Sequence, residues 1–167
     1  MIIRDAGKDD LASIVDIYNS TVHSRMVTAD LQPIAVEDRL SWFHSHKPHQ
    51  RPLWVAESDG RVAGWLSMHS FYGRPAYHIT AELSIYISPD YRHCGIGSQL
   101  LQAAIEKSPS FGLVNLVGFI FAHNTPSLGL FKKFGFQQWG YLPEVAEFEG
   151  VLRDLVIVGL KLGGSDA

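Results

Sequence analysis

The 167-residue chain has few of the features that mark secreted, membrane-spanning or nucleic-acid-binding proteins. Its single cysteine excludes an internal disulfide bond and fits a reducing compartment. No apolar run approaches the roughly 18 residues that suggest a membrane-spanning helix, and the first residues show no signal-peptide core. The net charge of −3 provides no overall basic field to attract nucleic acid. We therefore expect a cytoplasmic protein that binds neither membranes nor nucleic acids.

A metal site is also not expected, although the chain contains eight histidines. His44, His46 and His49 show no H-x-x-x-H spacing, and no pair of cysteines is available beside them, so we expect them on a solvated surface. A chain of this length buries roughly 70% of its unfolded surface in one domain. We expect that domain to span residues 1–163, followed by a flexible tail at 164–167.

The stretch from residue 81 to residue 101 organises the rest of the sequence. Apolar and polar side chains alternate over residues 82–87, which is typical of a strand. Gly95 and Gly97 then precede apolar residues at helical spacing. A glycine loop that leads into a helix presents backbone N–H groups at the positive end of the helix dipole, and Arg92 adds a fixed positive charge. The stretch predicts a site for a phosphate-bearing ligand.

Two common glycine-loop motifs do not fit this stretch. A Walker loop needs Gly-Lys-Ser/Thr, but Gly97 is followed by Ser98-Gln99. A dinucleotide fingerprint needs a third glycine, and Leu100 occupies that position. The remaining motif is R-x-x-G-x-G, and an ordinary glycine turn that caps a helix remains an alternative at this point.

Periodicity and turn residues predict one α/β domain with the element order β-α-α-β-β-β-α-β-α-β-β. Asp59-Gly60 marks a type I′ hairpin turn, and Gly135 is expected to end the last helix. Helices are also expected after Gly97 and at Thr125. The other expected helices span residues 9–22 and 36–46, and the expected strands span residues 2–6, 53–58, 61–68, 82–87, 113–121, 136–142 and 154–160.

This element order and two motifs resemble the GNAT superfamily of acetyl-CoA-dependent N-acetyltransferases. R-x-x-G-x-G resembles the superfamily's pyrophosphate loop, and Asn124 before a helix that ends in Phe134-Gly135-Phe136 resembles its second cofactor segment. The resemblance covers nearly the whole chain and implies a single GNAT domain. That domain would have a mixed, centrally splayed sheet flanked by about four helices. Asn124 would contact the pantetheine arm, although an asparagine that only caps the helix remains an alternative.

Within the superfamily, the chain is most similar to the phosphinothricin and methionine sulfoximine N-acetyltransferases. The segments Arg74-Pro75-Ala76-Tyr77 and Thr80 to Tyr86 carry this resemblance. It implies acetyl transfer to the α-amino group of a small amino acid or analogue, and a homodimer. The substrate pocket would include Tyr72, Gly73, Arg74, Glu82, Leu83 and Ser84. Acetyl-CoA would contact Ile85, Tyr86, Ile87, Arg92, His93, Cys94, Gly95, Ile96, Gly97, Ser98 and Asn124.

Glu82 is the candidate general base, because it is the only carboxylate in the middle of an otherwise apolar strand. Burial there would raise its pKa, so that it could deprotonate an ammonium group directly or through a water. It could instead hold the ammonium by charge, face solvent on an edge strand, or pair with Arg74. Arg74 is the candidate for binding a substrate carboxylate, with a solvated loop arginine as the alternative. A backbone N–H within Ser84–Tyr86 would meet the developing oxyanion.

Several positions depart from the family pattern. Phe131 stands where many members carry a tyrosine that protonates the leaving thiolate, so the sequence names no general acid. Cys94 lies in the glycine loop, and we expect its modification to block acetyl-CoA binding. Glu147 and Glu149 stand where a basic residue is usual, which leaves the substrate less defined than the reaction. Other amines, such as a protein N-terminus, an aminoglycoside or a polyamine, and a non-catalytic acyl-CoA sensor are the alternatives.

Overall fold

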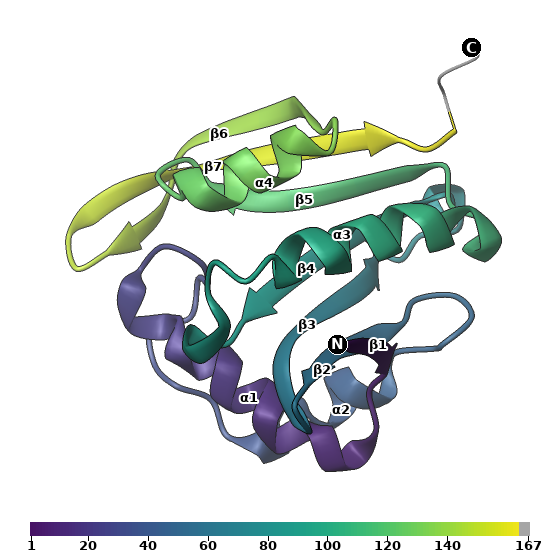
Figure 1. The fold of residues 1–167 in the computed structure, drawn as a ribbon. Coiled ribbons are helices and arrows are strands. Elements are labelled where there is room, and N and C mark those ends of the chain that lie inside the picture. Colours follow the sequence, from purple (N-terminus) through teal and green to yellow (C-terminus); the bar gives the residue numbers. More distant parts are fainter. Residues whose placement is uncertain (164–167) are drawn as a thin grey trace.

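The computed structural model describes residues 1–163, and the predicted tail at 164–167 lies outside the described residues. Seven strands in this part of the chain form one mixed sheet in the order β1-β2-β3-β4-β5-β7-β6 (Figure 1). The strands are β1 (Ile2–Asp5), β2 (Leu53–Ser58), β3 (Arg61–Ser70), β4 (Thr80–Ile87), β5 (Asn115–Phe121), β6 (Gln137–Phe148) and β7 (Val151–Lys161). The α-helices are α1 (Leu11–Ser20), α2 (Leu40–His44), α3 (Ile96–Lys107) and α4 (Thr125–Lys133).

Neighbouring strands pair antiparallel, except for β4 and β5 at the centre of the sheet. These two strands pair in parallel from Thr80 opposite Asn115 to Leu83 opposite Gly118, and the pairing ends there. Beyond that point β4 stays with β3 and β5 stays with β7, so the two central strands separate toward their C-terminal ends (Figure 1). The predicted mixed and centrally splayed sheet is confirmed.

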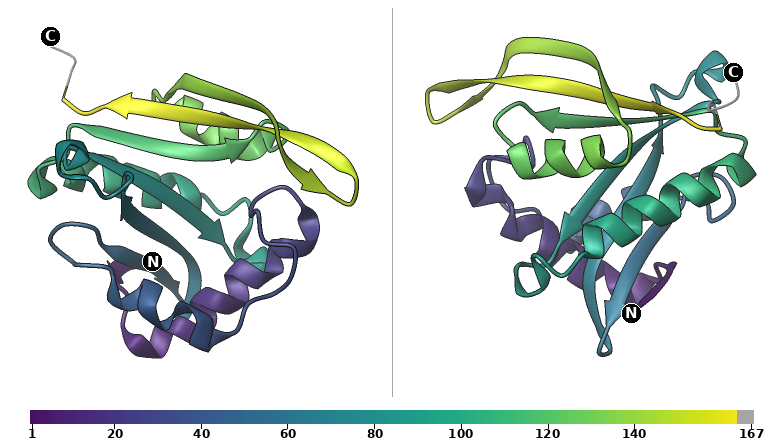
Figure 2. Two further views of the ribbon diagram at one scale, coloured as in Figure 1. Left: turned by 180° about the vertical axis from the view of Figure 1, so that it is seen from behind. Right: turned by 45° about the horizontal axis from the view of Figure 1, so that its top comes forward.

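The helices cover opposite faces of the sheet in pairs (Figure 2). The core under α3 and α4 includes Leu100 and Phe131, together with Ala81 and Leu83 of β4. The core under α1 includes Ile14, Tyr18 and Trp65, and Trp42 of α2 packs against it. Because side chains alternate along a strand, β4 presents its apolar residues to α3 and α4 and its polar residues to the α1 face.

One helix and the last two strands differ most from the expectation. The helix expected over residues 36–46 is a 3₁₀ turn at Val36–Arg39 followed by the five-residue α2, and at their junction Arg39 leaves helical geometry with φ −110° and ψ 2°. The last two strands are much longer than expected and form a hairpin that turns at Glu149-Gly150. Both turn residues have positive φ, as in a type I′ turn, and so have Asp59 and Gly60.

Pro143 explains why sequence patterning underestimated this hairpin. Proline cannot donate to a ladder and so indicates the end of a strand. In the structure, Pro143 falls where the β6–β7 register shifts between Leu142 and Ala146. This irregularity accommodates Pro143, which a regular ladder would exclude. Pairing resumes at Ala146 opposite Arg153.

Gly64 lies where β3 approaches the second half of β4 closely. A Cβ atom at Gly64 would lie 2.8 Å from Ile87 Cδ1 and 2.9 Å from the backbone oxygen of Tyr86. We expect Gly64→Ala to lower the free energy of unfolding by about 1–3 kcal/mol, because the carbonyl can move only with its strand. Urea denaturation measures this change.

Gly129→Ala is the matched control, because Gly129 lies in α4 and a Cβ there meets no atom within 4 Å. Alanine favours the helix, so this variant should be neutral or more stable by up to about 1 kcal/mol. Equal destabilisation of both variants would contradict the packing account.

Candidate active site

The opening between β4 and β5 holds a small cavity of about 50 Å³. Within residues 1–163, β4 from residue 84 onward has a partner strand on its β3 side only, so the backbone groups that face β5 have no strand to bond. The cavity is lined by Val27, Leu83, Ser84, Ile85, Tyr86, Phe119, Ile120, Asn124, Ser127 and Phe131. The structure thus brings together four of the predicted β4 residues and Asn124, which is about 40 positions away in sequence.

The predicted anion loop leads into α3 with its N–H groups free. His93 and Gly95 both adopt left-handed backbone conformations, with φ of 63° and 78°, and α3 begins at Ile96. Within residues 1–163, the backbone N–H groups of residues 93–98 donate to no protein acceptor. Unpaired amides at a helix N-terminus form a site for a phosphate group. The loop therefore has donors suited to a phosphate-bearing ligand, and the exposed Arg92 stands at its entrance.

Gly97 allows α3 to approach α4 beside this loop. A Cβ at Gly97 would lie 3.2 Å from Leu130 Cδ2, which is tighter than ordinary contact. Because α3 and α4 lie on the same face of the sheet, the loop before α3 and the residues before α4 come near the same end of the opening (Figure 2). The two segments that resemble cofactor motifs are therefore neighbours in space.

The Asn124 side chain caps the N-terminus of α4 with its oxygen, and its Nδ2 atom remains available as a donor. It is buried, and its side-chain oxygen accepts a hydrogen bond from the Ser127 N–H at 3.3 Å, which caps α4. No protein acceptor within residues 1–163 takes the hydrogens of its Nδ2 atom. The side chain therefore caps the helix and still offers a donor to a ligand in the cavity.

Glu82 lies on the other face of β4, which it shares with Ser84 and Tyr86. Its strand is central, with His69 of β3 and Val117 of β5 directly opposite Glu82 on either side. Burial raises the pKa of this carboxyl group, as expected for a general base. The interpretation of Glu82 as an exposed edge-strand residue is wrong, because β4 is an interior strand and Glu82 is partly buried.

Pairing of Glu82 with Arg74 is also absent from the ion pairs of residues 1–163. Arg74, Gly73 and Tyr72 lie in the exposed loop between β3 and β4. Gly73 and Arg74 line a separate cavity of about 520 Å³, with Arg51 and Phe111 among its other walls. The cavity that Gly73 and Arg74 line does not include Glu82, and the role of this loop in substrate binding remains a prediction.

Sequence patterning missed a polar cluster beside Glu82. Trp42, His46, Ser67 and His69 are linked by hydrogen bonds on the α1 face of the sheet. His46 is partly buried and bonded to Ser67 at 2.7 Å, so its expected position on a solvated surface is wrong. The alternation in β3 places Ser67 and His69 on one face, but only the β3–β4 register shows that this face contains Glu82.

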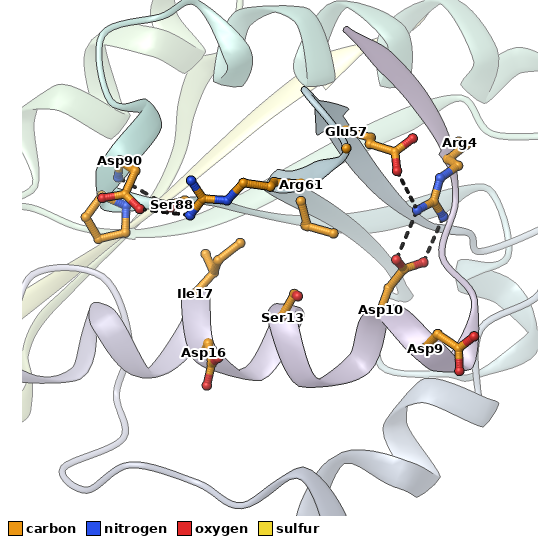
Figure 3. A pocket seen from close by; sticks show the side chains of 13 residues that line it. Arg4, Asp9, Asp10, Ser13, Asp16, Ile17, Glu57, Arg61, Ser88 and Asp90 are labelled. Carbon is orange, nitrogen blue, oxygen red and sulfur yellow. Dashed lines mark hydrogen bonds and ion pairs between the residues drawn. The ribbon is translucent and has the colours of Figure 1, made fainter.

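A second large cavity, of about 510 Å³, lies near the start of α1 and contains none of the predicted site residues. Its charged side chains pair mostly with each other. Arg4 lies between the carboxylates of Asp10 and Glu57, at 2.8 and 3.6 Å, and Arg61 pairs with Asp90 at 3.3 Å (Figure 3). These pairs satisfy the charges that a ligand would otherwise meet.

The fold and the opening define the class of the protein. Residues 13–136 match the model of the Acetyltransferase (GNAT) family. The chain belongs to this family, and the predictions of a GNAT fold and of an acetyltransferase are confirmed. No helix within residues 1–163 combines the length and apolar character needed to cross a membrane. No group of three or more metal-binding side chains occurs in the same range.

Individual relatives place the chain in the predicted branch. A Bacillus subtilis protein that bears the provisional name phosphinothricin acetyltransferase YwnH is 52% identical, over 97% of this chain and 99% of its own. The L-methionine sulfoximine/L-methionine sulfone acetyltransferase of Pseudomonas aeruginosa is 35% identical, over 96% of this chain and 94% of its own. The solved structure of a Sinorhizobium meliloti phosphinothricin acetyltransferase in complex with acetyl-CoA has a TM-score of 0.92 at 28% identity, covering 99% and 91% of the two chains.

Chemical modification of Cys94 tests the predicted anion loop. Its exposed thiol lies between the two left-handed residues His93 and Gly95. Alkylation with iodoacetamide should weaken acetyl-CoA binding at least ~10-fold, or about 1.4 kcal/mol, because the added group would occupy the space over the free amides. Calorimetric titration with acetyl-CoA measures this. Cys94→Ser exposed to the same reagent is the control, and unchanged affinity after complete labelling would contradict the assignment.

Proposed function

We propose that the protein transfers an acetyl group from acetyl-CoA to the α-amino group of a small amino acid or analogue, of the phosphinothricin or methionine sulfoximine type. The observation that carries the proposal is the position of Glu82, a carboxylate with a raised pKa on the strand that borders the opening. The named activities of the relatives support the substrate class.

The residues of the opening suit acetyl-CoA, which supplies an acetyl group activated as a thioester. The free amides of residues 93–98 and Arg92 would hold its pyrophosphate. Asn124 would donate to the pantetheine arm from its unpaired Nδ2 atom. Residues 85–87 would contribute backbone groups on the edge of β4 that lacks a partner strand.

The proposed mechanism is direct attack by the amine in a ternary complex. The substrate arrives as an ammonium ion and attacks only after losing a proton, which Glu82 accepts directly or through one water. Backbone N–H groups within Ser84–Tyr86 would stabilise the negative charge that develops on the carbonyl oxygen. Phe131 lines the cavity without a proton to donate, and a thiolate is a tolerable leaving group because a thiol has a pKa of about 8.5.

Arg74 remains our candidate for binding the substrate carboxylate, because its forked guanidinium matches two oxygens and it is exposed on the β3–β4 loop. We also propose a cytoplasmic location, which the free thiol of Cys94 fits. Acetylation of another amine and a non-catalytic acyl-CoA sensor are the competing functions, and activity on a panel of amines separates them.

Replacement of Glu82 tests reaction and base together. Thiol release from acetyl-CoA would be followed with phosphinothricin, methionine sulfoximine, methionine sulfone, natural amino acids, a polyamine and a peptide. We expect turnover on the amino-acid analogues, and Glu82→Gln should lower it at least ~10²-fold, as loss of a general base predicts. Acetyl-CoA binding without turnover on any amine would instead favour a sensor.

Stability provides the control for this variant. Burial raises the pKa of Glu82 in the folded state above its pKa in the unfolded chain. The contribution of Glu82 to the free energy of unfolding is therefore complete below the unfolded-state pKa and is lost as the pH rises through the folded-state pKa. Glu82→Gln should therefore be as stable as the wild type, or more stable, near pH 8. If the variant were unfolded at this pH, the loss of turnover would reflect unfolding and not loss of the base. A thermal unfolding curve of the variant distinguishes these two explanations.

The long β6–β7 hairpin supports a proposed homodimer. It carries large apolar side chains that are 41–55% exposed, namely Trp139, Tyr141, Leu142, Val145, Val151 and Leu152. Light scattering should give twice the chain mass, and Leu152→Lys should shift the protein toward the monomer because it places a charge among these side chains. A wild-type monomer at high concentration would contradict the proposal.

A further inference from the structure

Two histidines, a serine and a tryptophan form a hydrogen-bonded cluster on the face of the sheet that carries Glu82. Ser67 Oγ lies 2.7 Å from His46 Nε2 and 2.8 Å from His69 Nε2. Trp42 Nε1 lies 3.1 Å from the same His69 nitrogen. The proposed reaction uses none of these side chains, yet they border its base.

The indole of Trp42 determines the tautomer of His69. An indole N–H can only donate, so His69 Nε2 must accept, and the neutral imidazole carries its hydrogen on Nδ1. Burial, together with the smaller effects of the charges on His46 and Arg39, lowers the pKa of His69 to about 4. The ring is therefore neutral at any pH near 7 and keeps a hydrogen on the nitrogen that Trp42 leaves free.

His69 and Glu82 are direct cross-strand partners in the β3–β4 register. Side chains that oppose each other in this way have Cβ atoms roughly 4.5–5.5 Å apart. Within residues 1–163, the Nδ1–H of His69 has no protein acceptor and the Glu82 carboxylate has no protein donor. A partly buried donor and a partly buried acceptor, both unpaired, thus lie side by side.

We propose that His69 is a positioning residue that donates its Nδ1–H to the Glu82 carboxylate, directly or through one water. Burial favours the protonated carboxyl group, whereas a hydrogen bond to the charged form opposes this effect. His69 would thereby hold the base ionised and fix its orientation. The inference rests on the proposed role of Glu82.

Other ionisable groups on this face could influence a titration of Glu82. His46 lies with its ring 5.0 Å from that of His69, and Arg39 stacks over the Tyr18 and Trp42 rings. Tyr86 follows Glu82 on the same strand face, and Tyr18 bonds to Asp30. His46→Gln is the matched control, because it removes a neighbouring imidazole while His69 and its bond to Trp42 remain.

The experiment is a carboxyl ¹³C NMR titration of Glu82 in the full-length protein. Leucine at position 69 removes the donor, so His69→Leu should raise the Glu82 pKa by about 1 unit. In His69→Asn, the amide Nδ2–H can replace the imidazole Nδ1–H, so most of the shift should disappear. His46→Gln should leave the Glu82 pKa near the wild-type value. An unchanged Glu82 pKa in His69→Leu would overturn the proposal.

The ring nitrogens of His69 provide a second measurement that needs no variant. Long-range ¹H–¹⁵N NMR of the wild type near pH 7.5 should show Nδ1 protonated and Nε2 bare, and Trp42→Phe should mix the tautomers. A wild-type proton on Nε2 would overturn the proposal even if His69→Leu fails to fold.

Activity separates this inference from the proposed function. If the enzyme acetylates an amino acid, the acidic limb of its kcat/KM profile should move to higher pH in His69→Leu, by the same amount as the Glu82 pKa. An unmoved limb would overturn the proposal. If no amine is acetylated, the proposed function fails, and the two NMR measurements still decide whether His69 bonds to Glu82.

Discussion

The parallel pairing of β4 with β5 stops after Leu83 and Gly118, and the candidate site depends on that stop. A continuous sheet would bond both edges of β4 and would fill the space that the cavity occupies. Glycine at position 64 lets β3 lie close to the second half of β4, because a Cβ there would lie 2.8 Å from Ile87 Cδ1 and 2.9 Å from the Tyr86 carbonyl oxygen. The free backbone groups of the opening follow from the end of the β4–β5 pairing.

This opening separates a site that suits an anionic ligand from a carboxylate with a raised pKa. The two would conflict in one environment, because positive charge beside a carboxylate lowers its pKa. An anionic cofactor needs donors and positive charge, which the free amides before α3 and Arg92 provide on one face. The proposed deprotonation of an ammonium ion would use Glu82, a carboxylate with a raised pKa on the α1 face. An acetyl group that lies in the gap between the strands would be reachable from both faces. The proposed ternary mechanism therefore agrees with the architecture.

Sequence predicted the features that depend on neighbouring residues. The alternation over residues 82–87, the glycine that ends α4 at Gly135 and the cap at Asn124 are local, and the structure contains all three. The length of the β6–β7 hairpin was missed because Pro143 hides a bulge. The pairing of His69 opposite Glu82 depends on the register of two strands, which composition and periodicity do not define.

The most direct test of the account is a ¹H–¹⁵N NMR titration of the protein with acetyl-CoA. The account predicts that the largest shifts fall on the amides of residues 93–98 and 84–87, with the Asn124 side chain among them. Shifts concentrated around the cavity of Arg4 and Asp10, or around the exposed loop at residues 71–78, would contradict the claim that the opening between β4 and β5 is the cofactor site.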